Sequence, residues 1–108
     1  MPFDPRLAER MRGALRDRAG IDERKMFGGY CWMLHGNMLC GVEVGRYMFR
    51  VGKEQEAAAL DRPGAAPMDI TGRPMRGFVW VRGEHAEGAE LEEWIDLAAR
   101  YVATLPAK

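Results

Sequence analysis

The fold is decided by the segment YCWMLHGNMLCGVEVGRYMFRV, residues 30–51, in which the apolar pattern has a period close to two. Gly36-Asn37 and Gly45 divide this segment into three short runs, each of the length of a β-strand. Consecutive strands joined by tight turns pair antiparallel. The segment therefore predicts three antiparallel strands.

The first hairpin of this segment has one face that is apolar throughout, whichever two-residue turn it uses. That face, which we expect to meet the core, consists of Cys31, Met33, Met38, Cys40 and Val42. The opposite face is unusually apolar for a solvated surface and carries Tyr30, Trp32, Leu34, Leu39 and Glu43. In the third strand Tyr47, Phe49 and Val51 are expected inside, with Arg46, Met48 and Arg50 outside. One sheet face is thus expected to be partly apolar and uncovered.

Helical patterns flank the strands. Asp4-Pro5 is typical of a helix start, and apolar residues then recur every fourth position up to a stop at Gly20. A short helix is predicted over 53–60, and the final helix over 87–105 carries a long apolar stripe.

The segment 61–75 contains several prolines and glycines, which predict an irregular connection between the short helix and a strand at 77–81. A loop of this length in a small domain is typical of a functional segment, although a short strand near 68–70 would weaken that argument. The predicted class is α+β, with helices packed on an antiparallel sheet.

Composition limits the function classes. The chain has 108 residues, as expected for a single domain over 1–108, and its 16 basic and 16 acidic residues give a formal net charge of zero. This balance argues against nucleic acid as a partner. The N-terminus is charged, and no apolar run reaches the roughly 20 residues of a membrane-spanning helix, so we expect a cytoplasmic protein without a membrane partner.

The sequence offers no catalytic or metal-binding constellation. Serine is absent, the two cysteines and two histidines lack metal-ligand spacing, and we expect no catalytic residue, no metal and no cofactor. A His35-Gly36 turn would place Cys31 directly opposite Cys40, whereas a Gly36-Asn37 turn would make them diagonal neighbours. Two buried free thiols are the expectation.

Three motifs in order resemble the N-terminal domain of the TfoX/Sxy family. They are KMFGG at 25–29, MLHGNM with CGV at 33–42, and GRPMRGFV at 72–79. The resemblance implies an α-β(3)-α-β(2)-α fold similar to that of secretion chaperones, and it supplies no catalytic residue. Members that regulate competence carry a second, C-terminal domain, whereas this chain is expected to be a stand-alone N-terminal domain.

Two functional hypotheses follow. The first is a non-enzymatic regulatory or protein-interaction module, which would use Tyr30, Trp32, Leu34 and Leu39 to bind a protein partner or a second copy of the chain in a homodimer. The second is a binding protein for anionic small molecules, or an undiscovered enzyme, that uses Arg73 and Arg76, with Cys40 as a further candidate, around a pocket beside the 61–75 connection.

Overall fold

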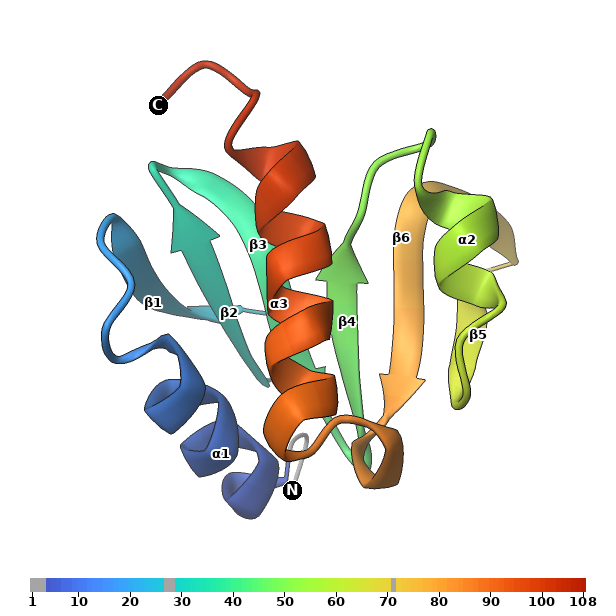
Figure 1. Cartoon of the computed structure of the whole chain (residues 1–108), viewed down its shortest axis with the longest axis horizontal. Helices are drawn as coiled ribbons and strands as arrows, with labels where there is room; N and C mark the ends of the chain where they lie inside the picture. The colour runs from blue at the N-terminus through green and yellow to red at the C-terminus, as the bar shows by residue number, and fades with distance from the viewer. Residues whose placement is uncertain (1–3, 27–28, 71) are drawn as a thin grey trace.

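The structure, a computed structural model, describes residues 4–26, 29–70 and 72–108. Its elements in chain order are α1 (Pro5–Leu15), β1 (Ile21–Met26), β2 (Gly29–Leu34), β3 (Asn37–Glu43), β4 (Arg46–Arg50), α2 (Glu56–Leu60), β5 (Ala65–Ile70), β6 (Arg73–Arg82), a 3₁₀ turn (Gly83–His85) and α3 (Gly88–Val102). The strands form one antiparallel sheet in the order β1-β2-β3-β4-β6-β5 (Figure 1). The predicted α+β class is confirmed, with one strand more than the expected order.

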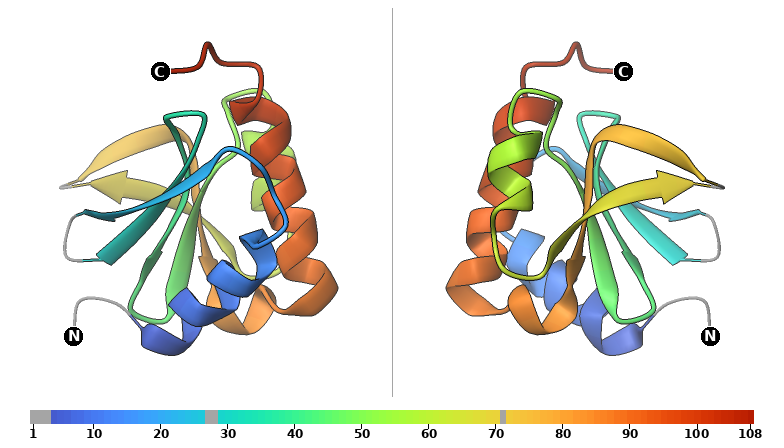
Figure 2. Two further views of the ribbon diagram at one scale, coloured as in Figure 1. Left: turned by 90° about the vertical axis from the view of Figure 1, so that its left-hand side faces the viewer. Right: turned by 90° about the vertical axis from the view of Figure 1, so that its right-hand side faces the viewer.

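All three helices lie on the same side of the sheet, which Figure 2 shows in both side views. The core lies between them and the sheet, where Phe49 stacks on Trp94 of α3 with ring centroids 5.4 Å apart. We call the opposite side the outer face; no described helix covers it. None of the helices in the described ranges has the length and apolarity that crossing a bilayer requires.

A β-bulge in the first hairpin decides which side chains face the helices. The turn is His35-Gly36, with positive φ at both residues, and it pairs Leu34 with Asn37. Past Met33 the register shifts, so that Trp32 lies opposite Cys40. The bulge adds a residue to β3. The side chains that were expected to share one face of the hairpin therefore lie on both faces of the sheet.

The expected inside and outside of this hairpin are therefore wrong for β2 and for Met38 and Leu39, whereas Cys40 and Val42 lie in the core as expected. Tyr30, Trp32, Leu34 and Leu39, predicted to form an exposed contact surface, pack in or against the core on the helical side. Trp32 is 2% exposed, Leu34 8% and Leu39 0%. The size and apolarity of Trp32, Leu34 and Leu39 serve core packing, so these three are not available to a partner in the folded chain, whereas Tyr30 is only half-buried.

The third predicted strand behaves as expected. Tyr47, Phe49 and Val51 of the β4 region are fully buried in the core, and Arg46, Met48 and Arg50 alternate with them toward the outer face. Here no bulge interrupts the pairing of β4 with β3, so the period of two carries through.

Strand β1 was missed because its sequence, IDERKM, is mostly charged. It pairs with β2 at one edge of the sheet, where charged side chains are typical because they discourage pairing with another chain. Glu23 of β1 accepts two hydrogen bonds from Arg12 of α1, at 2.7 and 3.1 Å, and one from the Trp32 indole at 3.1 Å. The Arg12 guanidinium holds the pKa of Glu23 below its usual value. Polar contacts thus join this strand to the helical layer.

The segment 61–75 is mostly a hairpin, not an irregular loop. Strand β5 and the start of β6 occupy most of it, with a register shift between Pro67 and Asp69. Proline is tolerated there because β5 is an edge strand. The argument that this segment is functional because it lacks secondary structure is therefore wrong.

Tyr47 anchors α1 to the sheet. Its buried hydroxyl donates a hydrogen bond to the Leu7 carbonyl oxygen of α1 at 2.6 Å. Burial raises the pKa of Tyr47 to about 12. The folded state therefore holds the phenol proton more tightly than the unfolded chain does.

We expect this pKa difference to make the domain lose stability at alkaline pH. Between the unfolded pKa of about 10 and the folded pKa of about 12, only the unfolded state releases the proton, so the free energy of unfolding falls as pH rises, by about 2 to 3 kcal/mol in total. In Tyr47→Phe this contribution is absent, whereas all other titrating groups remain. Urea unfolding across this pH range should show that the free energy of unfolding falls more steeply with pH in the parent than in Tyr47→Phe. Equal slopes in the two proteins would contradict the raised pKa of Tyr47.

Candidate functional site

The outer face of the sheet contains an apolar groove with a volume of about 460 Å³. Among the described residues, four of the chain's eight methionines line it, together with two aromatic rings from β6. The apolar lining includes Cys31, Met38, Gly41, Met48, Met68, Met75, Phe78 and Trp80. We call this hollow the methionine groove.

Gly41 keeps part of the groove free of side chains. It lies opposite Cys31 in the β2–β3 pair, and a Cβ atom there would lie 3.2 Å from Cys31 Sγ and 3.4 Å from Met48 Cε. Sulfur-bearing side chains surround this position. Methionine is flexible and polarizable, so such a surface adapts to partners of different shape.

Of the three charged residues that line the groove in the described part of the chain, Arg46 and Glu43 pair with each other, and the third is Asp69. Arg46 lies over the Trp80 ring, 3.6 Å from its centroid, and donates to Glu43 at 2.8 Å. The stacked guanidinium extends the flat surface of the indole. This part of the groove therefore offers apolar area and little net charge.

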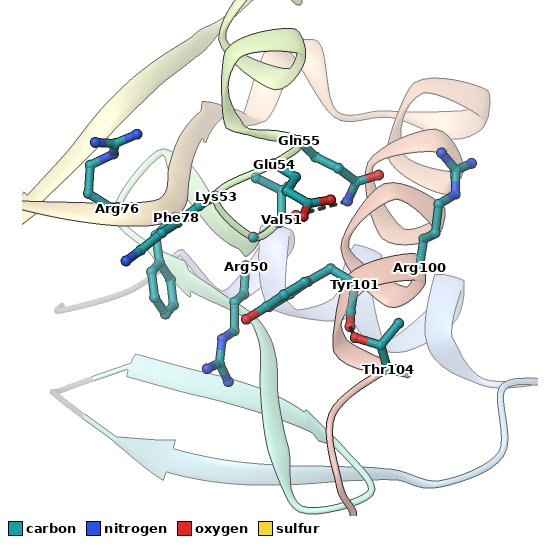
Figure 3. Close-up of a pocket in the computed structure, with 12 residues that line it drawn as sticks. Arg50, Val51, Lys53, Glu54, Gln55, Arg76, Phe78, Arg100, Tyr101 and Thr104 are labelled. Carbon is teal, nitrogen blue, oxygen red and sulfur yellow. Dashed lines mark hydrogen bonds between the residues drawn. The ribbon is translucent and has the colours of Figure 1, made fainter.

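Beside the methionine groove, a second hollow of about 660 Å³ opens where α3 passes the end of β4 (Figure 3). Four cations and one carboxylate are among the residues that line it: Arg50, Lys53, Arg76, Arg100 and Glu54. In Figure 3 Lys53 and Arg76 lie on the β6 side and Arg100 on the α3 side, and the Tyr101 ring reaches between them toward Arg50. We call this hollow the basic cleft.

Two glycines form part of the wall of the basic cleft. The backbone N–H groups of Val51 and Gly52 both donate to the Gly77 carbonyl oxygen, at 2.8 and 2.9 Å. Both glycines have positive φ, and a Cβ on Gly52 would lie 2.5 Å from Cδ1 of Tyr101. Only glycine fits here, so backbone and an aromatic ring meet directly at the cleft.

Arg50 is held in place by rings. Its guanidinium carbon lies 5.6 Å from the Phe78 centroid and 5.8 Å from the Tyr101 centroid, within the range of cation–π attraction. Within the described ranges its side chain forms no ion pair, and neither do those of Lys53 and Arg100. Three cations beside this cleft therefore lack a carboxylate partner in the described part of the chain.

Of the two arginines predicted to bind a ligand, only Arg76 lines the basic cleft. It pairs with Glu56 at 3.2 Å, and Glu56 also accepts the backbone N–H of Gly77. The Gly77 N–H, followed by Arg76, lowers the pKa of Glu56. Arg73 is exposed in the β5–β6 hairpin and lines neither hollow, so the structure does not bring the predicted pair together.

The two thiols are separated by the bulge. Cys31 belongs to the outer face, while Cys40 lies in the core, 3.9 Å from the Met11 sulfur. Both are free and buried, as predicted, and burial raises the pKa of each thiol. Neither of the two alternative placements, directly opposite or diagonal, describes the observed register. In the described part of the chain no three His, Cys, Asp or Glu side chains are grouped to hold a metal ion.

A comparison of the chain with sequence models of protein families explains the three motifs at 25–29, 33–42 and 72–79. The sequence model of the TfoX N-terminal domain matches residues 14–101 of the chain. The chain belongs to this family. Within the TfoX N-terminal match lie the whole sheet, α2 and most of α3, so it includes nearly all the residues that line both hollows. Neither the curated proteins nor the solved structures contain a significant match.

Sequence reasoning missed most of the residues that line the two hollows. The eight methionines in 108 residues were a usable signal for the groove, since methionine is common at adaptable binding surfaces. For the basic cleft, Arg50 and Lys53 are near each other in sequence, but Arg100 and Tyr101 join them only through the packing of α3.

Proposed function

We propose that this TfoX N-terminal domain is a non-enzymatic interaction module of a regulatory kind, which binds an amphipathic helix of another protein in the methionine groove. The observation that supports this most is a predominantly apolar lining on the outer face of a sheet whose other face is already packed by helices. Apolar concavities of this kind on small domains mark contact sites. The raised thiol pKa values agree with a role outside catalysis.

The dimensions of the groove favour a helix. Its lining comes from the five strands β2 to β6, which span four inter-strand spacings of about 4.8 Å, or roughly 19 Å. A helix that lies across the strands would cover this distance with about 13 residues. A helix bound there would cover the outer face of the sheet, as the three helices of the chain cover the opposite face.

The chemistry of the groove favours an apolar stripe on that helix. Arg46 is already neutralised by Glu43, and methionines and aromatic rings supply most of the remaining contact area. A stripe of Leu, Ile, Met or Phe at helical spacing is the partner surface that such grooves accept. Arg46 is the one basic residue in the described lining and is paired with Glu43, so the groove does not offer the several free basic groups between aromatic rings that bind single-stranded nucleic acid.

A site-specific photo-crosslinker tests the proposal in the native cell. We expect a crosslinker in place of Met38, which is half-buried in the groove, to capture a protein partner, whereas the same group in place of Ala103, exposed on the helical side, captures none. Peptide mapping should place the crosslink on the apolar stripe of a helix in the partner. Crosslinks to a second copy of this chain, or to a non-helical segment, would overturn the proposal.

Matched substitutions test the affinity with the mapped partner segment. Met75→Arg and Met48→Arg introduce a charge into the groove and should weaken binding by at least about tenfold, because central contacts dominate such interfaces. Met75 is half-buried and tolerates the longer side chain best. Ala103→Arg adds the same charge on the helical side and should bind as the parent does. Equal binding by Met75→Arg and Ala103→Arg would contradict the proposal.

A further inference from the structure

We propose that the basic cleft is a binding site for a small organic anion whose acid group is attached to an aromatic ring, such as an aryl phosphate. This site is distinct from the partner site proposed for the methionine groove, although Phe78 lines both hollows. Its volume of about 660 Å³ lies within the usual range of ligand pockets.

The charge of the cleft is a local feature of the fold. The chain as a whole has a formal net charge of zero, yet the cleft lining carries four cations and one carboxylate. Residues about 50 positions apart, Arg50 and Arg100, are brought to one opening by the packing of α3 beside the end of β4. An anion entering this opening meets cations on both sides.

Arg50 is the group best placed to receive the acid. The Phe78 and Tyr101 rings restrict its guanidinium without using its hydrogen-bond donors, and no described carboxylate pairs with it. Its planar fork matches the oxygens of a phosphate or carboxylate. Because the rings already hold it, little side-chain freedom is lost when an anion binds.

The same rings explain why the ligand should carry an aromatic group. Tyr101 and Phe78 both line the cleft, and the absence of a side chain at Gly52 lets the Tyr101 ring pack directly on the backbone of the wall. Aromatic rings prefer offset or edge-to-face contact with another ring, and such contacts add to the burial of apolar area. A ring attached to the anion would use this wall while the acid meets Arg50 and Lys53.

The test is an NMR titration of the full chain with phenyl phosphate, with inorganic phosphate and phenol as the two halves of that probe. We expect saturable shifts of the backbone N–H signals of Gly52, Lys53 and Gly77 with phenyl phosphate, and clearly weaker binding of either half. Arg50→Gln should weaken phenyl phosphate binding by at least about tenfold, because a charge-assisted contact is lost. Arg16→Gln removes an exposed cation from the end of α1 and is expected to change nothing.

Tyr101→Leu provides a second, independent variant, because it keeps apolar bulk but removes the ring. It should weaken the binding of phenyl phosphate more than that of inorganic phosphate, because inorganic phosphate loses only the ordering of Arg50 by the ring, whereas phenyl phosphate also loses the contact between the two rings. The proposal is overturned if phenyl phosphate produces no saturable shifts at the cleft, if its shifts fall on the methionine groove, if inorganic phosphate binds equally well, or if Arg50→Gln binds like the parent. These readouts do not depend on any protein partner, so their failure leaves the proposed function standing.

Discussion

Trp32→Ala is expected to lower the free energy of unfolding by about 3 to 5 kcal/mol, which is the usual effect of removing a buried indole. The side chain is 2% exposed and packs within the core on the helical side of the sheet. Its indole N–H also donates to Glu23, which links β2 to β1. Truncation would leave a cavity and remove that link at the same time. Urea unfolding followed by circular dichroism measures the effect.

Trp80→Ala is the matched control for this prediction, because Trp80 is half-buried on the outer face, under Arg46. We expect it to cost only about 1 to 2 kcal/mol, since less area is buried and no closed cavity forms. The comparison tests which face of the hairpin region forms the core. A larger loss in Trp80→Ala than in Trp32→Ala would show that the faces are assigned the wrong way round.

Gly52→Ala is expected to destabilise the domain by about 2 to 4 kcal/mol, from two sources. The residue has φ of +82°, a backbone conformation that costs a residue with a Cβ atom. The new methyl group would also lie 2.5 Å from the Tyr101 ring, which must move away from the cleft wall. Thermal and urea unfolding give the size of the loss, and the Tyr101 ring signals report its displacement.

Gly45→Ala isolates the backbone contribution. Gly45 also has positive φ, of +74°, but nothing lies within 4 Å of the position that an alanine methyl group would take. The expected loss is about 1 to 2 kcal/mol, from backbone strain alone. The excess in Gly52→Ala measures the contact with Tyr101. Equal losses in the two variants would contradict the close packing of this ring on the backbone.

Prediction from the sequence succeeded where local patterns act alone. Asp4 was expected at the start of α1, and its side chain accepts a hydrogen bond from the Arg6 backbone N–H at 2.9 Å. Such a cap depends only on residues within one turn of the helix. The apolar stripe of α3 was also located correctly, with Trp94 and Ile95 in the core, although the helix ends at Val102 and not at Leu105.

Prediction failed where an element depends on a distant neighbour. Strand β1 has no apolar alternation, and its extended form is stabilised by pairing with β2. Segment 61–75 has turn-forming residues, yet β6 holds most of it in a hairpin. Of the candidate ligand-binding pair, Arg76 was located correctly at a hollow, whereas Arg50 was assigned only to an outer strand position.

The sequence by itself determined the α+β class, the helical stripes and the alternation of Tyr47, Phe49 and Val51, because the periods of helix and strand are local properties of the chain. Only the tertiary structure decided which face of the hairpin meets the helices. One bulge beside Trp32 reverses the pattern beyond it, since each strand residue points opposite to the next. The basic cleft likewise exists only in the folded chain, where α3 carries Arg100 and Tyr101 to the end of β4.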